Sequence, residues 1–372
     1  RAFAHTAPSG YKALNTSSLP QPTIADSSKY FDADLYTGTG SALERSNLSF
    51  NPDFLWFKQR SGSSTSHALF DVIRGGDKRL VSNGTNAEVD VDQYGGGVTS
   101  FDSDGFTLGT WTAINASSET YVAWAWDAGT STVTNNDGSI ASQIRAQPSA
   151  GFSIISYSGT GSNASIGHGL NAAPAFFFGR NRDDTSGSLD WIIYHQAIGN
   201  TARLKFNLGS KSTSSTFFQN TSPSNSVISI GTSNDINKSG DDYIIYAFSE
   251  VANFSSMGSY LGNGSDDGPF CYCGFKPRLI FTKAYSSNSN NNSHWLIYDT
   301  LSDSNPYNEA DTVLYATISN PLNTHSSMGI DILSNGFKLK ADPSGYSNYN
   351  GWDYLYYAVA ENPFHATGGL AH

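Results

Sequence analysis

The chain has 372 residues, of which 14% are charged and 13% aromatic, and its formal net charge is −11. An acidic chain without a long basic run lacks the electrostatic footprint of a protein that binds nucleic acid non-specifically. No apolar run approaches the roughly 18 residues that a membrane-spanning helix needs. We therefore expect no nucleic-acid partner and no membrane insertion.

The first segment, residues 1–30, shows no sustained hydrophobic period. It contains Pro8, Pro20 and Pro22 among small polar residues. Proline interrupts helices and central strands alike. We predict an extended N-terminal arm, or the remnant of a preceding domain.

From residue 31 onward, four landmarks occur three times in the same order. The first is Tyr-x-Gly-x-Gly, which begins at Tyr36, Tyr157 and Tyr260. The second is a proline followed six residues later by a cation, as in Pro52/Lys58, Pro174/Arg180 and Pro277/Lys283. The third is an apolar segment ending in a polar residue, at 67–71, 191–195 and 295–299. The fourth is a tyrosine-led strand, at 121–126, 243–248 and 354–359. Repeats of this length are the size of small domains rather than of solenoid units.

Within each repeat, short apolar runs lie between turn signals, and no stretch has the pattern of a long amphipathic helix. We predict an all-β chain of three tandem antiparallel β-sandwich domains, of jelly-roll or concanavalin-like type. The expected boundaries are 31–128, 151–250 and 251–364, with a linker over 129–150 and a C-terminal tail over 365–372. Asp104-Gly105 and Asn335-Gly336 predict matching hairpins in repeats one and three.

The cation of the second landmark and the polar residue of the third suggest a cross-strand pair. Lys58 would pair with Asp71, and Lys283 with Asp299, whereas repeat two has Arg180 and His195. A catalytic interpretation would need an acid and a base with shifted pKa values in one cleft. The favoured interpretation is structural, because such pairs commonly stabilise neighbouring strands.

Aromatic residues in polar loops are the candidates for ligand binding. Tyr346, Tyr349 and Trp352 lie in the segment 344–352, which is rich in Ser, Asn and Gly. Trp111, in the corresponding loop of repeat one, is a weaker candidate. Aromatic faces stack on sugar rings, and loops of this composition suit adaptable binding. The alternative is that these rings cover the core of their own hairpin or a subunit contact.

Signals for catalysis and for metal binding are weak. Adjacent aspartates such as Asp266 and Asp267 lie in turns, where the carboxylate most often bonds its own backbone. A calcium ligand set from these turns stays open, but no acid pair recurs in all three repeats. Cys271 and Cys273 stand two apart, which predicts unpaired packing residues. We predict no catalytic residue, no cofactor and no metal site.

Several segments resemble a family of tailed-phage virion proteins with tandem SPRY-like or lectin-like β-sandwich repeats. They are residues 3–14, 100–109, 258–264, 267–270, 274–277 and 360–364. The resemblance implies a structural protein on the virion exterior, in a tail fibre, a tail tip or the capsid surface, with other virion proteins as partners. By analogy with such proteins we expect a homo-oligomer, with a trimer as the first guess.

The expected function is that of a tail-fibre or tail-tip adhesin that binds host surface glycans and is not an enzyme. One alternative is a capsid decoration or spacer protein that binds no ligand. A second alternative is a glycan depolymerase.

Overall fold

The computed structural model describes residues 22–206, 209, 211–286, 293–303, 308–325 and 327–363. Most of the predicted N-terminal arm and the predicted tail over 365–372 lie outside the described residues. Within them the chain is almost entirely β, and every pair of named strands is antiparallel. The helices are single turns: η2 (Ser27–Lys29), η3 (Asp92–Tyr94), α1 (Thr112–Asn115), η4 (Gln196–Ile198), α2 (Ser215–Phe218) and α3 (Asn234–Asn237). No described helix has the length and apolar character to cross a membrane.

Repeat one, residues 31–128, forms a large and a small sheet. The large sheet has the order β1-β9-β3-β4-β5-β6. Its strands are β1 (Phe31–Thr37), β3 (Phe54–Gln59), β4 (Ala68–Asp71), β5 (Gly75–Leu80), β6 (Val89–Asp90) and β9 (Thr120–Trp126). The small sheet, in the order β2-β8-β7, consists of β2 (Leu43–Arg45), β7 (Val98–Asp102) and β8 (Gly105–Leu108).

Repeat three, residues 251–363, has the same pattern. Its large sheet has the order β20-β28-β22-β23-β24-β25, from β20 (Ser255–Leu261), β22 (Phe275–Ala284), β23 (Leu296–Asp299), β24 (Thr312–Tyr315), β25 (Asn323–Thr324) and β28 (Asp353–Pro363). Its small sheet joins β21 (Phe270–Tyr272), β26 (Ile330–Leu333) and β27 (Gly336–Leu339). The hairpins β7–β8 and β26–β27 turn at the predicted positions, so that prediction is confirmed.

Repeat two differs in its small sheets and in the edge of its large sheet. The large sheet has the order β10-β11-β12-β19-β14-β15, from β10 (Val133–Asn135), β11 (Ser142–Gln147), β12 (Phe152–Ser158), β14 (Phe176–Asn181), β15 (Ile192–His195) and β19 (Asp242–Phe248). Two strand pairs join β13 (Ala164–Gly167) to β18 (Val227–Ile230) and β16 (Ala202–Arg203) to β17 (Ser212–Thr213).

The predicted linker over 129–150 is wrong, because this segment forms β10 and β11 of the second sheet. β11 pairs along the outer edge of β12. An uncovered edge strand exposes a row of unpaired backbone groups. Ile144 of β11 is also buried in the core of repeat two. Backbone pairing with β12 and burial of this side chain therefore both hold the segment in place.

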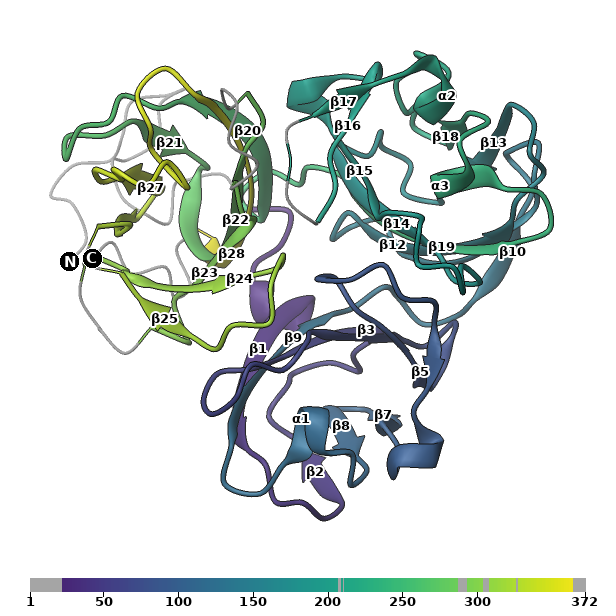
Figure 1. Ribbon diagram of the computed structural model, residues 1–372, viewed down its shortest axis with the longest axis horizontal. Coiled ribbons are helices and arrows are strands. Elements are labelled where there is room, and N and C mark those ends of the chain that lie inside the picture. The colour runs from purple at the N-terminus through teal and green to yellow at the C-terminus, as the bar shows by residue number, and fades with distance from the viewer. Residues whose placement is uncertain are drawn as a thin grey trace, which may run out of the picture.

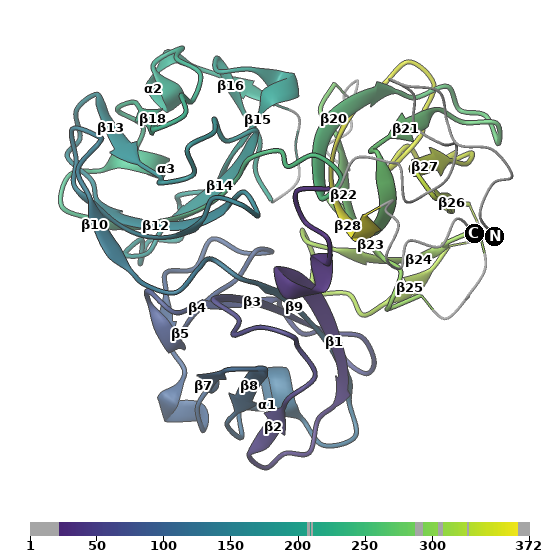
Figure 2. The same ribbon diagram turned by 180° about the vertical axis from the view of Figure 1, so that it is seen from behind.

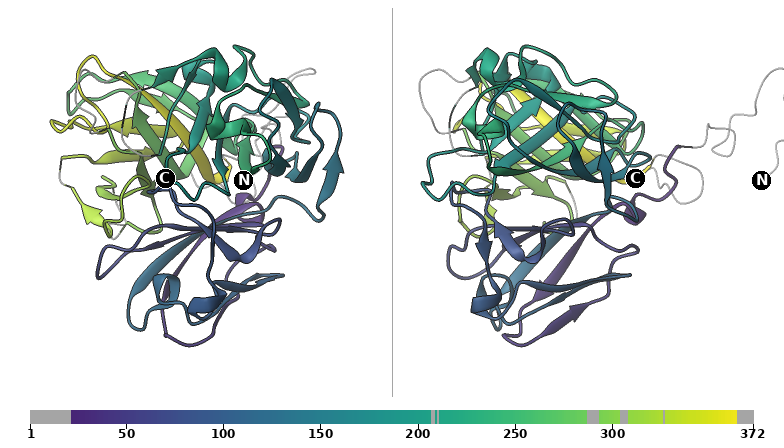
Figure 3. Two further views of the ribbon diagram at one scale, coloured as in Figure 1. Left: turned by 45° about the vertical axis from the view of Figure 1, so that its right-hand side comes forward. Right: turned by 90° about the vertical axis from the view of Figure 1, so that its right-hand side faces the viewer.

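The three repeats stand around a common centre rather than in a row (Figure 1). Figure 2 shows the same arrangement from behind, and in Figure 3 the first repeat lies below the other two. One hydrophobic cluster contains residues of all three repeats, among them Trp56, Phe178 and Phe281. Both faces of each large sheet are therefore covered, and β3 and β14 are buried at every residue. This explains why these strands read as unbroken apolar runs rather than as alternating ones.

Equivalent residues of the repeats meet at successive levels along this centre. The Trp56 ring lies 5.8 Å from the Phe178 ring and 5.5 Å from the Phe281 ring. One level away, the Trp126 ring lies 6.3 Å from the Phe248 ring. The three sheets therefore run in the same direction, and the three Tyr-x-Gly-x-Gly turns lie at one end of the body, which we call the turn end.

The N-terminal segment and the last strand close the ring of repeats. Ile24 is buried in the shared cluster, and the Ser27 hydroxyl donates to the Glu361 carbonyl oxygen at 2.8 Å. The part of the predicted arm that the structure describes, residues 22–30, thus packs against the body where repeats one and three meet.

Candidate ligand-binding site

Tyr349 and Trp352 form an aromatic pair in the loop that leads into β28. Tyr349 is 44% exposed, and its ring lies 4.7 Å from the Trp352 ring at an angle of 40°. Gly345 lies against the indole: a Cβ atom there would come within 3.0 Å of a ring carbon. The pair therefore forms one apolar surface backed by the loop itself. We call it the aromatic platform.

The platform stands on buried hydrogen bonds. The Asn348 side-chain oxygen accepts from the Asn263 backbone N–H at 2.9 Å, and its amide nitrogen donates to the Ser265 and Lys340 carbonyl oxygens. The Tyr354 hydroxyl accepts from the Tyr349 N–H at 2.9 Å. Since Asn348 and Tyr354 are fully buried, the backbone beneath the platform is fixed in one conformation.

The same arrangement recurs at the turn end of every repeat. Two stacked tyrosines flank each turn, with ring centroids 5.2, 5.3 and 5.0 Å apart in Tyr36/Tyr121, Tyr157/Tyr243 and Tyr260/Tyr354. The first tyrosine of each pair donates to the carbonyl before a buried asparagine: Tyr36 to Ile114, Tyr157 to Ile236 and Tyr260 to Ser347. These asparagines are Asn115, Asn237 and Asn348, each 0% exposed. We call the two tyrosines and the asparagine the tyrosine–asparagine scaffold.

The scaffold was missed from the sequence, although its signal is there. In every repeat the asparagine stands six residues before the tyrosine of the fourth landmark. The Tyr-x-Gly-x-Gly landmark supplies the partners of these asparagines. The backbone N–H groups of Thr39, Thr160 and Asn263 donate to the asparagine side-chain oxygens.

The residues carried by the scaffold differ between repeats. In repeat two the positions of Tyr349 and Trp352 hold Lys238 and Asp241, which form an ion pair at 2.8 Å. The correspondence follows from the backbone, since Gly262 and Gly159 bond the Trp352 and Asp241 carbonyl oxygens, each at 2.8 Å. In repeat one the same two positions hold Ala116 and Glu119, and the Gly38 N–H bonds the Glu119 carbonyl oxygen. Within the described residues, the aromatic pair belongs to repeat three alone.

Tyr346 belongs to a separate aromatic group on the same loop. Its ring lies 5.4 Å from the His294 ring and 6.5 Å from the Tyr315 ring. The Tyr315 hydroxyl lies 2.7 Å from Nε2 of His325. Burial lowers the pKa of His294 to about 4, so this imidazole is neutral at pH 7 and serves as a hydrogen-bonding group.

The weaker candidate, Trp111, is a core residue. It is 9% exposed, packs edge-on against Phe70, and lies under the Arg79 guanidinium at 5.1 Å. It precedes α1 at the position that Ser344 occupies in repeat three. The predicted binding role of Trp111 is wrong, because the ring fills the space between the two sheets of its own repeat.

The predicted pairs Lys58/Asp71 and Lys283/Asp299 are also wrong, because of strand register. Asp71 lies opposite Phe54, and Asp299 lies opposite Leu279. Each lysine is four residues further along its strand, which is about 13 Å away at about 3.3 Å per residue.

Both lysines bond carbonyl oxygens instead. The Lys58 ammonium donates to the Ser319 carbonyl of repeat three at 3.1 Å, and the Lys283 ammonium donates to the Ser293 carbonyl at 2.5 Å. Burial lowers the pKa of Lys58 to about 8 and that of Lys283 to about 7. In repeat two, Arg180 reaches the Thr85 carbonyl of repeat one. Lys58 and Arg180, cations of the second landmark, therefore join one repeat to the next.

The polar residues of the third landmark join repeats as well. The Tyr246 hydroxyl of repeat two donates to the Asp71 carboxylate at 2.7 Å. The Trp124 indole of repeat one donates to Asp299 of repeat three at 3.0 Å. His195 donates from Nε2 to the Tyr356 carbonyl oxygen at 3.0 Å.

The first residue of the third landmark also contacts a neighbouring repeat in each case. The ring nitrogens donate to equivalent carbonyls one repeat away: His67 to Tyr315, Trp191 to Val81 and Trp295 to Lys205, at 2.8, 2.7 and 2.7 Å. The repeated landmarks thus form the interfaces between repeats, whereas the sequence had suggested contacts within each repeat.

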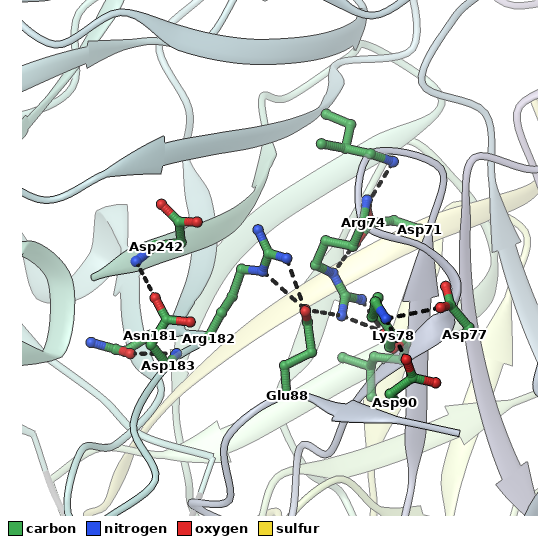
Figure 4. A network of polar contacts seen from close by, with 12 residues as sticks. Asp71, Arg74, Asp77, Lys78, Glu88, Asp90, Asn181, Arg182, Asp183 and Asp242 are labelled. Atoms are coloured by element: carbon green, nitrogen blue, oxygen red, sulfur yellow. Dashed lines mark hydrogen bonds and ion pairs between the residues drawn. The ribbon is translucent and has the colours of Figure 1, made fainter. Parts of the chain in front are cut away.

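An ion network reinforces the contact between repeats one and two (Figure 4). Glu88 lies between two guanidinium groups, at 3.1 Å from Arg74 and 2.8 Å from Arg182 of repeat two. Arg74 also pairs with Asp71 at 2.5 Å. Beside this network, Asp77, Asp90 and Asp92 lie close together. The Lys78 ammonium pairs with Asp77 and Asp90, at 2.9 and 2.6 Å, so the charge of this group is already partly balanced.

The two cysteines and the aspartate turns are structural. Cys271 and Cys273 are free and buried, as predicted. The Asp184 carboxylate accepts from the Leu189 and Ser186 backbone N–H groups, and Asp267 pairs with Lys338.

Comparison with known proteins gives a family but no named relative. Comparison with curated proteins and with solved structures finds no match. Residues 26–363 match the family described as Domain of unknown function (DUF7483). This match runs through all three repeats. The chain belongs to the DUF7483 family.

Proposed function

We propose that this protein is a non-catalytic structural protein of a phage virion exterior, in a tail fibre or tail tip, that binds host surface glycans through the aromatic platform. The observation that carries the proposal is the exchange of side chains on one scaffold. Repeat two places Lys238 and Asp241 where repeat three places Tyr349 and Trp352. Since the scaffold does not need aromatic side chains at these positions, Tyr349 and Trp352 are free to serve recognition.

The chemistry of the platform suits a sugar. Aromatic rings offer a flat apolar face with large contact area and little conformational entropy to lose. Asn350 follows Tyr349 directly, is exposed, and lies against the turn at Gly264. Its amide supplies hydrogen bonds to hydroxyl groups.

The position of the platform suits an exposed contact. β28 begins at Asp353 beside the platform and runs 11 residues to Pro363, a length of about 35 Å. The described N-terminal residues meet β28 at its far end, where Ser27 bonds Glu361. The first and last described residues therefore lie opposite the platform, and we propose that the turn end faces a cell.

We interpret each repeat as a lectin-like β-sandwich, since each packs a large sheet against smaller strands. Other virion proteins are the expected partners, and a homotrimer is the expected oligomer by analogy. Several copies on one particle would convert weak individual contacts into useful avidity. The alternatives are a decoration or spacer without a ligand and a glycan depolymerase.

A glycan array tests the proposal with the purified protein clustered on a multivalent support. We expect binding that Trp352→Ala abolishes and that Asp241→Ala, the matched change in repeat two, leaves intact. Absence of binding at high clustering density would favour the spacer. Release of reducing sugar from host polysaccharide would favour the depolymerase.

A further inference from the structure

The turn ends of the three repeats differ at a third position, besides the two of the platform. The second scaffold tyrosine bonds the carbonyl of this residue in each case: Tyr121 to Thr112, Tyr243 to Asn234 and Tyr354 to Gly345. Thr112 and Asn234 begin the helical turns α1 and α3. Gly345 has φ +82° instead, and no helix forms there.

Gly345 is the residue that makes room for the indole. A Cβ atom at this position would lie 3.0 and 3.2 Å from two ring carbons of Trp352 and 3.5 Å from Cβ of Tyr349. A positive φ adds a cost for any residue with a side chain. A larger residue would therefore push Trp352 out of its seat, although it would not touch a ligand.

We infer that Gly345 is a positioning residue for recognition, and that Gly345, Tyr349 and Trp352 together confine the glycan site to repeat three, so that each chain binds one ligand through the face of one pyranose ring. This inference rests on the proposed function. In repeat two the same places hold Asn234, Lys238 and Asp241, on a scaffold with equivalent hydrogen bonds.

The equivalence of the scaffolds allows a transfer of the site. The triple variant Asn234→Gly/Lys238→Tyr/Asp241→Trp would rebuild the platform in repeat two. The probe is the oligosaccharide with the strongest wild-type array signal, titrated in solution by calorimetry. We expect a stoichiometry of one per chain for the wild type and two for the triple variant. The double variant that keeps Asn234 should stay at one.

Gly345→Ala separates positioning from folding. We expect about a tenfold loss of affinity, the equivalent of about 1.4 kcal/mol, with an unchanged stoichiometry. Gly240→Ala is the matched control in repeat two, because Gly240 also has a positive φ but a Cβ there would meet no other atom within 4 Å. Both variants should lower the melting temperature slightly, and only Gly345→Ala should lose affinity. Wild-type affinity in Gly345→Ala, two sites in the wild type, or one site in the triple variant would each overturn the inference while leaving the proposed function standing. A wild-type protein that binds no glycan would overturn both.

Discussion

Repeats two and three have turns of the same architecture that carry chemically different side chains. Tyr157, Asn237 and Tyr243 make the hydrogen bonds in repeat two that their counterparts make in repeat three. The turn of repeat two carries the ion pair Lys238/Asp241, and the turn of repeat three carries the aromatic pair Tyr349/Trp352. The comparison separates what holds the turn from what the turn displays. Residues that recur in all three repeats serve the fold, and residues peculiar to one repeat are where recognition can differ.

The largest effect should come from a landmark residue at an interface. Asp71 is fully buried and pairs with Arg74, and it accepts from Tyr246 of the next repeat. Asp71→Ala should cost about 3–5 kcal/mol, because it leaves a buried cation short of a partner. Chemical denaturation measures this loss. Asp267→Ala, at an exposed ion pair, is the control and should leave stability nearly unchanged.

The scaffold asparagines should give intermediate and nearly equal losses. Asn237→Ala and Asn348→Ala each leave buried backbone groups without partners, at a cost of about 1–3 kcal/mol. Thermal unfolding measures both. Only Asn348→Ala should also weaken glycan binding, because it alone supports the aromatic platform. Equal effects of both variants on binding would contradict the separation drawn above.

Acid should weaken the body through His67 and His195. Burial lowers their pKa values to about 3 and about 4, so the unfolded chain takes up protons below about pH 6.5 that the folded chain refuses. Their stabilising contribution is thus present above about pH 6.5 and falls as the pH drops from there, to about pH 4 for His195 and to about pH 3 for His67. His67 shows the reason: Nδ1 accepts from the Trp56 indole, and Nε2 donates to Tyr315. The melting temperature of His195→Gln should depend less steeply on pH in this range than that of the wild type.

The smallest effect on stability should come from the platform itself. Trp352→Ala removes a half-buried ring that contacts Tyr349 and Gly345 and packs against the edge of the shared hydrophobic cluster. Because the ring is only partly buried, its loss should cost about 1 kcal/mol or less, the low end of what single substitutions cost. Differential scanning calorimetry should show a melting temperature close to that of the wild type, together with lost binding. A large drop in melting temperature would make the ring a packing residue.

The sequence predicted the β class and the paired hairpins because turn residues and short apolar runs are local signals. It failed for the partners of Lys58 and Asp71, since a repeat can encode a contact to the next repeat as readily as one within itself. It failed for Trp111 for a related reason. Spacing placed Trp111 in the right loop but did not show which side of the turn faces the core.

The aromatic loop was identified from its composition alone, and the structure divides its aromatic residues into two groups. Tyr349 and Trp352 form the platform, whereas Tyr346 packs with His294. Asn348 and Gly345 gain their importance from backbone geometry, from a buried amide and from a positive φ. Neither property follows from residue type, although a three-way alignment of the repeats would have revealed Asn348.

The most direct test of the central claim follows the indole N–H signals of the seven tryptophans in a nitrogen-15 NMR titration with the array oligosaccharide. Six of these rings lie in the cores, among them Trp56, Trp111 and Trp124. We predict that the signal of Trp352 shifts in proportion to occupancy while the six core signals stay in place. A shift of the Trp111 signal with Trp352 unmoved would contradict the account.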